Sequence, residues 1–225
     1  MTKKYWYTLW LWLSFPALVW AQSSLLIQQL DRTDGLSQNS VIAIAQDEEG
    51  YMWFGTRDGL NKYDGYRFIT FRRDQNQSSS SLPSNDIRKL YYDTLTHQLW
   101  IGTPNGVSSY NIYTHQFTNY LSNPENNDTY FVKDIFRDQA KNLWLATPKG
   151  LLLLDEQSGV AKQIPLSTTT KNVRTIYQDE EAVLWIGTTE GLFLLQQRAE
   201  HFIKKDLEQY APGLSIFKDL CIKTI

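Results

Sequence analysis

The chain has 225 residues, of which 22 are Lys or Arg and 24 are Asp or Glu. Its formal net charge of −2 gives no electrostatic case for nucleic acid or an anionic membrane as a partner. Cys221 is the only cysteine, so an internal disulfide is excluded and stability must come from packing.

The first 21 residues are typical of an export signal. Lys3 and Lys4 precede the uncharged, largely apolar run 5–20, and Ala21 ends a stretch suited to signal peptidase. An uncleaved membrane anchor is the alternative, but the run is shorter than the roughly 20 residues a spanning helix needs, and Pro16 interrupts it. Cleavage leaves 20 basic and 24 acidic residues, a net charge of −4. We therefore expect a periplasmic or otherwise extracytoplasmic domain over residues 22–225.

A short motif recurs four times in the mature chain. Each copy has Trp, then Gly or Ala two residues later, Thr at three and Gly at six, and the Trp residues are 47, 44 and 41 apart. This spacing is close to the about 40–45 residues of a four-stranded propeller blade. One Trp per copy favours packing between blades over a sugar-stacking platform. The motif residues are Trp53, Gly55, Thr56, Gly59, Trp100, Gly102, Thr103, Gly106, Trp144, Thr147, Gly150, Trp185, Gly187, Thr188 and Gly191.

Each copy extends into a predicted blade of four antiparallel strands. Apolar columns lie six and three residues before an acidic residue, Asp47, Asp93, Asp138 or Asp179, which predicts an innermost strand packed on both faces. The Trp strand, a Gly turn and two further strands follow. The predicted units are blade 1 at about 40–72, blade 2 at 86–121, blade 3 at 131–166 and blade 4 at 172–205. We also expect a closing strand at 25–30 and the start of a fifth blade at 214–222.

The fold class predicted is therefore all-β, an incomplete and open β-propeller. Propellers have about 4–8 blades, and four blades with an orphan strand at each end are not expected to close a ring. We expect the chain to be the front of a longer protein, whose remaining blades would be its first partner.

The first copy has a specific resemblance to a known family. The stretch 47–65, preceded by Asp34-Gly35-Leu36-Ser37-Gln38-Asn39-Ser40-Val41, resembles the first blade of the two-component regulator propeller family. The resemblance covers residues 25 to about 222, although Ala146 replaces the usual Gly and Leu195-Gln196 the common Tyr-Asp. It implies a periplasmic sensor domain of a hybrid histidine kinase or diguanylate cyclase regulator, with an oligosaccharide or other small extracellular ligand. It further implies a membrane-bound signalling module and allows a homodimer of the parent.

No residue pattern predicts catalysis, a metal site or a cofactor. The clusters 47–49 and 179–181 occupy equivalent turns and are expected to be solvated, whereas a glycosidase needs an asymmetric pair facing one cleft. His97, His115 and His201 are widely separated and have no second ligand at suitable spacing. We therefore expect no catalytic, cofactor or metal residues.

The sequence predicts a non-catalytic ligand sensor, and two alternatives stay open. One is a propeller enzyme of the sialidase or polysaccharide-lyase kind, and the other is a stand-alone adhesion or scaffold propeller. Ligand contacts are expected where the copies differ, because loops on a rigid scaffold carry binding. These candidate positions are Arg57, Asp58, Tyr66, Asn105, Tyr113, Tyr130, Lys149 and Glu190.

Overall fold

Four separate antiparallel sheets make up the molecule. The computed structural model describes residues 27–76, 80–122, 130–166, 172–198, 201–211 and 213–214. Each sheet there contains four strands that are consecutive in the chain and neighbours in space. Such a meander is the unit of a propeller blade. The all-β, open propeller predicted from the sequence is confirmed.

The strands lie within the four ranges expected for the blades. Blade 1 has β1 (Val41–Gln46), β2 (Met52–Thr56), β3 (Gly59–Tyr63) and β4 (Phe68–Phe71). Blade 2 has β5 (Lys89–Asp93), β6 (Gln98–Thr103), β7 (Gly106–Asn111) and β8 (Phe117–Tyr120). Blade 3 has β9 (Asp134–Arg137), β10 (Leu143–Thr147), β11 (Gly150–Leu154) and β12 (Ala161–Ile164). Blade 4 has β13 (Val173–Gln178), β14 (Val183–Thr188), β15 (Leu192–Arg198) and β16 (His201–Lys205). Two short helices, η1 (Arg32–Asp34) and α2 (Leu207–Tyr210), lie outside the blades.

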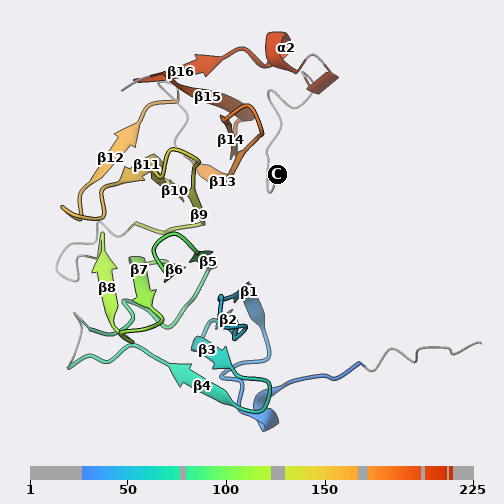
Figure 1. Ribbon diagram of the computed structural model, residues 1–225, viewed down its shortest axis with the longest axis vertical. Coiled ribbons are helices and arrows are strands. Elements are labelled where there is room, and N and C mark those ends of the chain that lie inside the picture. Colours follow the sequence, from blue (N-terminus) through green and yellow to red (C-terminus); the bar gives the residue numbers. More distant parts are fainter. Residues whose placement is uncertain are drawn as a thin grey trace, which may run out of the picture.

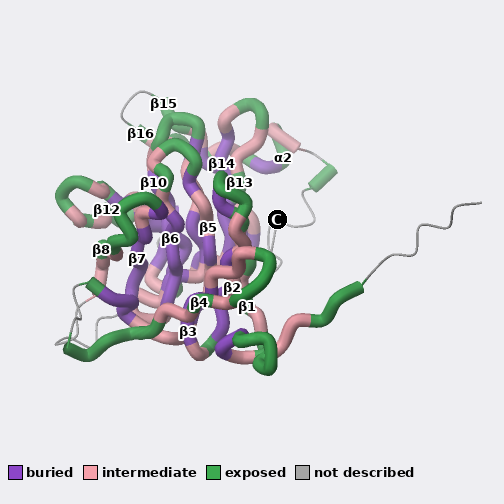
Figure 2. The backbone as a smooth tube through the Cα atoms, turned by 60° about the horizontal axis from the view of Figure 1, so that its bottom comes forward, coloured by how far each residue is buried: buried purple, intermediate pink, exposed green. Residues whose placement is uncertain are grey.

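The blades follow one another in an arc, with the first strand of each on the concave side and the fourth on the rim (Figure 1). The core lies between blades. The Trp face of blade 1, with Trp53 and Leu60, packs against Leu90, Ile101 and Tyr110 of blade 2. Equivalent clusters join blades 2 and 3 and blades 3 and 4. Buried residues accordingly run along the strands and exposed ones gather in the turns (Figure 2).

The small residue two places after each Trp lies where neighbouring blades approach most closely. A Cβ built on Gly55 would lie 2.6 Å from Cγ2 of Ile87 in the next blade. One built on Gly102 would lie 3.2 Å from Cγ1 of Val132. The repeat therefore places Gly or Ala there because a larger side chain would push the blades apart.

Two segments outside the four blades were expected to form strands, a closing strand at 25–30 and the start of a fifth blade at 214–222. Residues 27–30 form no strand and join none of the four sheets, so the closing strand predicted at 25–30 is wrong for this part. A closing strand needs a last blade beside blade 1, and the open arc brings none of the described strands there. Residues 25 and 26, the signal at 1–21 and residues 215–222 of the fifth blade lie outside the described residues.

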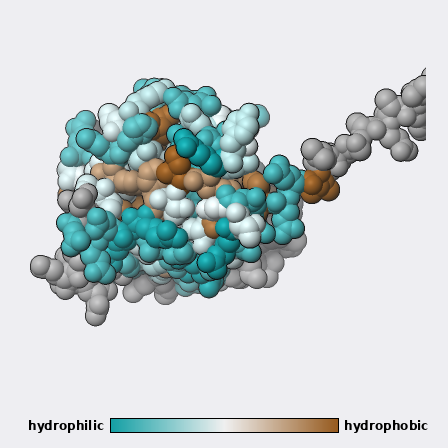
Figure 3. All heavy atoms as spheres, turned by 90° about the horizontal axis from the view of Figure 1, so that it is seen from below, coloured by the Kyte–Doolittle hydropathy of each residue, from teal (hydrophilic) through white to brown (hydrophobic). Residues whose placement is uncertain are grey.

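Blade 1 consequently presents an uncovered apolar face, which we call the open face: Ile42, Ile44, Met52, Phe54, Tyr63 and Phe68. Ile44 is 58% exposed, whereas its equivalents in blades 2, 3 and 4 are 2–5% exposed because a preceding blade covers them. Phe54, Tyr63 and Phe68 pack on one another, with ring centroids 4.6–6.4 Å apart. The space-filling view of this end shows an apolar band across it (Figure 3).

The Gly turns allow a test of how tightly the blades are built. Gly106 has φ of 104°, and a Cβ there would lie 2.6 Å from the carbonyl oxygen of Tyr120. Gly65 has a similar φ of 93° with nothing within 4 Å. We expect Gly65→Ala to lower the free energy of unfolding by about 1–2 kcal/mol through left-handed strain alone. Gly106→Ala should cost at least about 3 kcal/mol, because the clash adds to the strain. Urea unfolding measures the loss in each variant. Equal losses would show that the end of β8 shifts at no cost to make room for the added Cβ.

Candidate functional site

The repeat Trp and the acidic residue six places before it form a structural pair. Trp53 Nε1 donates to Asp47 Oδ2 at 2.7 Å, and Trp144 makes the same 2.7 Å bond to Asp138. Trp185 donates to Asp179 at 2.6 Å. The indoles of blades 1 to 3 are fully buried, so these Trp residues cannot serve as sugar-stacking platforms.

This finding corrects the expectation that the acidic turns are solvated. Asp47 is only 5% exposed, and its second oxygen accepts from the backbone amides of Glu49 and Tyr51. The following residues, Glu48 and Glu49, are the solvent-facing ones, together with Glu180 in blade 4. In blades 1, 3 and 4 the first acid of the turn therefore ties the turn to the indole, and it is buried in blades 1 and 3.

Blade 2 departs from this pattern. Asp93 Oδ2 is taken by Arg137 Nε of blade 3 at 2.5 Å, and both side chains are buried. Trp100 Nε1 is left buried without a hydrogen-bond partner among the described residues. Arg137 also reaches Glu156 at 2.7 Å and the Lys141 carbonyl at 2.8 Å. An ion pair across blades thus replaces the hydrogen bond within the blade.

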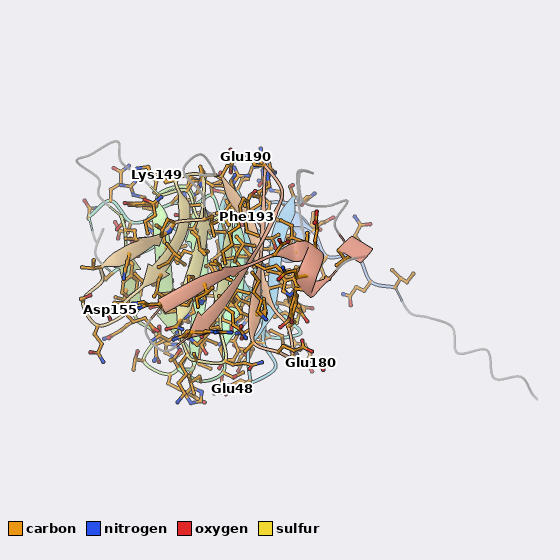
Figure 4. All side chains as sticks on the ribbon, turned by 90° about the horizontal axis from the view of Figure 1, so that it is seen from above. Glu48, Lys149, Asp155, Glu180, Glu190 and Phe193 are labelled. Atoms are coloured by element: carbon orange, nitrogen blue, oxygen red, sulfur yellow. The ribbon has the colours of Figure 1, made fainter. Side chains whose placement is uncertain are left out.

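The candidate turn residues share one rigid setting. In blade 1 the Thr56 hydroxyl donates to the Gly59 carbonyl and accepts from the Asp58 amide, at 3.1 and 3.0 Å. The same two bonds recur at Thr103, Thr147 and Thr188, where the amides of Asn105, Lys149 and Glu190 donate. We call this the Gly-turn end of the arc. Lys149 and Glu190 lie there, opposite Glu48, Asp155 and Glu180 (Figure 4).

Several candidates make local contacts. Asp58 pairs with Arg72 at 2.9 Å, and Lys149 Nζ lies 4.6 Å from the centroid of Tyr130. Tyr66, which is 94% exposed, lies instead in the turn between β3 and β4 at the opposite end of blade 1. Arg57 lies beside Asp58 in the Gly turn, and its backbone amide donates to Gln38. The Gly-turn end thus carries charged and aromatic groups on rigid, hydrogen-bonded turns. Such a surface is suited to binding rather than to acid–base chemistry.

Sequence reasoning missed a further group at this end, the basic row, which we define as Arg88, Lys133 and Arg174. These residues occupy one equivalent position, five before the acid, in three successive blades. Backbone amides hold two of them, because Arg88 donates to the Gly102 carbonyl and Lys133 to that of Ala146. The apolar positions used to align the four copies lie six and three residues before the acidic residue, so the position five before it was not compared. Blade 1 has Ile42 there.

At the opposite end, the candidate Tyr113 joins blades 1 and 2 together with Glu48 and His97. Glu48 Oε1 accepts from Tyr113 Oη at 2.5 Å and contacts His97 Nδ1 at 2.6 Å. The hydrogen bond from Tyr113, with further help from His97, holds the pKa of Glu48 below its ordinary value. Burial, with the charge of Glu48 beside it, raises the pKa of Tyr92 to about 12. This cluster links neighbouring turns of blades 1 and 2.

The histidines are not gathered. His97 contacts Glu48, His115 Nδ1 lies 2.9 Å from Tyr110 Oη, and His201 is exposed on β16. Within the described residues no three His, Cys, Asp or Glu side chains are placed to hold a metal ion. In the same part of the chain, none of the helices has the length and apolar character needed to cross a membrane.

Acid should weaken the fold through two of these carboxylates. Burial raises the pKa of Asp179, but hydrogen bonds from Trp185, Val183 and Tyr210 outweigh it and leave the pKa below 3.8. Because the pKa values of Asp179 and Glu48 are lowered in the folded state, the stabilisation they give is present at neutral pH. It is lost as pH falls below 4.5 for Glu48 and 3.8 for Asp179.

We expect the urea midpoint to fall with pH in this range, and Glu48→Gln to flatten the upper part of the decline. Glu49→Gln, at the exposed neighbour, is the matched control and should leave the profile unchanged. An identical pH profile for wild type and Glu48→Gln would contradict the linkage.

The comparisons with known proteins agree with this architecture. Residues 35–58 match the model of the two-component regulator propeller family. The repeats are thus similar to those of two-component regulator propellers. The resemblance drawn from the sequence is thereby confirmed. Histidine kinase P4 of Formosa agariphila is 48% identical over 58 residues, which are 26% of this chain and 4% of that protein.

Solved structures extend the likeness across the arc. The extracellular domain of a putative hybrid two-component system from B. thetaiotaomicron is 30% identical with a TM-score of 0.59. That match covers 79% of this chain and 31% of the other. Virginiamycin B lyase from Staphylococcus aureus, 13% identical with a TM-score of 0.52, covers 72% of this chain and 54% of the lyase, and shares the fold alone. This chain thus spans less than a third of the extracellular domain that it matches.

Proposed function

We propose that this chain is part of an extracytoplasmic, non-catalytic sensor that recognises an oligosaccharide for a two-component regulator. The observation that carries the proposal is the 30% identity, over 79% of this chain, to the extracellular domain of a putative hybrid two-component system. The rigid Gly-turn end supports it, because binding is typically carried by loops on a fixed scaffold. Ligand binding would then bias the placement of neighbouring domains and, through them, a kinase or cyclase module at the membrane.

A lyase function is the second candidate, since virginiamycin B lyase shares the fold. That likeness is below the level at which it indicates chemistry, and fold alone does not carry function. The first acidic residue of each repeated turn has a structural role: Asp47, Asp138 and Asp179 bond indoles, and Asp93 pairs with Arg137. These engagements favour sensing.

The sensing proposal is tested by calorimetric titration of the purified chain against a panel of neutral and acidic oligosaccharides. We expect binding of at least one glycan, with the glycan recovered unchanged. Turnover of a bound glycan would replace the sensor with an enzyme, and failure of every glycan to bind would overturn oligosaccharide sensing.

We further propose that the open face receives another blade of the same kind, supplied by the remainder of the sensor. The equivalent faces of blades 2, 3 and 4 are each covered by the Trp face of the preceding blade. Ile44, exposed at the open face, is the counterpart of the buried core residues Leu90, Ile135 and Ile176. A further Trp-bearing blade would therefore cover the open face in the way that each blade of the arc covers the next.

Paired substitutions test this docking. In the chain alone Ile44→Glu should change the free energy of unfolding by no more than about 0.5 kcal/mol, as at other exposed sites. Leu90→Glu, at the equivalent buried position, should cost about 3 kcal/mol or more. In a chain extended by the remaining blades, Ile44→Glu should become as damaging as Leu90→Glu. A harmless Ile44→Glu in the extended chain would show that nothing covers this face.

A further inference from the structure

The basic row links three blades on the concave side of the arc. Cζ of Arg88 lies 5.5 Å and Nζ of Lys133 lies 6.0 Å from the centroid of the same ring, Phe131. Lys133 Nζ also contacts Asn172 Oδ1 at 2.5 Å, at the start of blade 4 and two residues before Arg174. Cationic groups from blades 2 and 3 therefore converge on one aromatic ring, and the row continues into blade 4.

Positive charge exceeds negative charge in this small region. The segments 86–89, 131–134 and 172–174 contain four basic residues and two acidic ones, although the whole chain is net negative. Asp134 is already engaged, because it pairs with Lys89 at 2.8 Å and accepts from the amides of Ile135 and Ile176. Asp134 is thus committed to Lys89 and to two backbone amides.

The two guanidinium groups of the row have unused hydrogen-bonding capacity. Arg88 meets Asp86 through one nitrogen, at 2.5 Å, while its Nε and the second oxygen of Asp86 have no partner among the described residues. Arg174 Nε is buried without a partner, and the side chain makes no hydrogen bond or ion pair with a described residue. A buried donor without an acceptor is costly, and the Arg fork is shaped for a two-oxygen anion.

We propose that the basic row binds the anionic groups, carboxylate or sulfate, of an acidic oligosaccharide at the concave side of the Gly-turn end. The saccharide part rests on the proposed function, whereas the anionic part rests on the row itself. Arg174 offers its free fork, Arg88 exchanges or shares Asp86, and Lys133 adds a point charge. Blade 1, with Ile42 at the equivalent position, lies outside the site.

The test titrates the full chain with three hexasaccharides: an oligogalacturonate, a sulfated glycan and a neutral galactan of the same length. We expect an acidic glycan to bind and the neutral one to bind at least about tenfold more weakly, with an affinity that falls as salt rises. The tighter of the two acidic glycans identifies the anionic group. Arg174→Gln and Arg88→Gln should each weaken acidic binding by about tenfold. Arg72→Gln is the matched control, because Arg72 is a paired Arg at the same end outside the row.

Two outcomes separate the claims. Equal binding of neutral and acidic glycans, unchanged in Arg174→Gln, would overturn the basic row and leave oligosaccharide sensing standing. Binding of citrate alone, lost in Arg174→Gln, would uphold the row as an anion site and overturn the saccharide. Thermal midpoints equal to wild type should accompany Arg174→Gln, because that side chain makes no described hydrogen bond to lose.

Discussion

Replacing Arg137 by Leu is expected to lower the free energy of unfolding by about 3–5 kcal/mol, the cost of removing one partner from a buried ion pair. Arg137 and Asp93 are 6% and 3% exposed, and their atoms are 2.5 Å apart. Asp93 also accepts from the Leu95 amide and the Thr96 hydroxyl, so its carboxylate is fixed in place. Leu would leave that charge buried without its cation.

Arg137→Gln should lower the free energy of unfolding much less than Arg137→Leu does. Blades 1 and 4 have Gln46 and Gln178 at the equivalent position, and each donates to a turn carbonyl, as Arg137 does to Lys141. Gln at 137 should keep that bond and release Asp93 to accept from Trp100 Nε1, which has no partner at present. We expect a loss of about 1 kcal/mol, within the range of one neutral hydrogen bond.

Urea unfolding at neutral pH measures both variants, and Trp fluorescence reports the new bond to Trp100. The single variants Asp93→Asn and Arg137→Gln and the double variant form a double-mutant cycle, which isolates the coupling between the two side chains. Equal losses in Arg137→Leu and Arg137→Gln would mean that Trp100 cannot recover the bond found in the other three blades.

The strand pattern could be predicted because one stretch of sequence is repeated. Four copies in register show which positions are invariant, and the invariant positions are those that the blade geometry dictates. Trp100 meets the next blade, Gly102 allows its close approach and Gly106 turns the chain. Local steric demands of this kind are encoded within each copy, so the order of the strands followed from sequence alone.

Contacts between blades were harder to predict, because they join residues that are distant in the chain. Glu48 meets His97 and Tyr113, which lie 49 and 65 residues away. The pairing of Arg137 with Asp93, 44 residues apart, replaces a bond that the repeat itself implies. Nothing within a single copy distinguishes these residues from ordinary turn residues.

The candidate site was partly predicted. Variable turn residues such as Lys149 and Glu190 do share one end of the arc (Figure 4). The basic row was missed, because the comparison followed apolar columns and Arg88, Lys133 and Arg174 occupy the polar position between them. The closing strand failed for a different reason: the pairing that would order it depends on a blade that is not beside blade 1.

The largest loss of stability is expected from Trp144→Ala. Trp144 is fully buried between blades 3 and 4, where it packs edge-on against Phe202 at 4.8 Å and donates to Asp138. Truncation removes the ring, leaves a cavity and takes one hydrogen bond from the buried Asp138 carboxylate, so we expect a loss of about 3–5 kcal/mol or more. That is a large share of the about 5–15 kcal/mol that stabilises a typical domain.

Trp185→Ala is the matched control, because it removes the same side chain at the end of the arc. Trp185 is half-buried, and among the described residues α2 packs on it through Tyr210 and Leu207. Its loss should cost about 2–3 kcal/mol, less than that of Trp144, since less packed surface disappears. In a repeat architecture each blade contacts only its neighbours, so the damage should also be local.

Hydrogen exchange resolved by peptide measures that locality. Trp144→Ala should speed exchange in β9 to β16 and leave β1 to β4 near the wild-type rate, whereas Trp185→Ala should affect β13 to β16 alone. Stability is then a sum of interface terms, and the arc opens from its weaker end, because α2 is a smaller cover than a blade. Uniform acceleration throughout all four blades in Trp144→Ala would instead show that the arc unfolds as one cooperative unit.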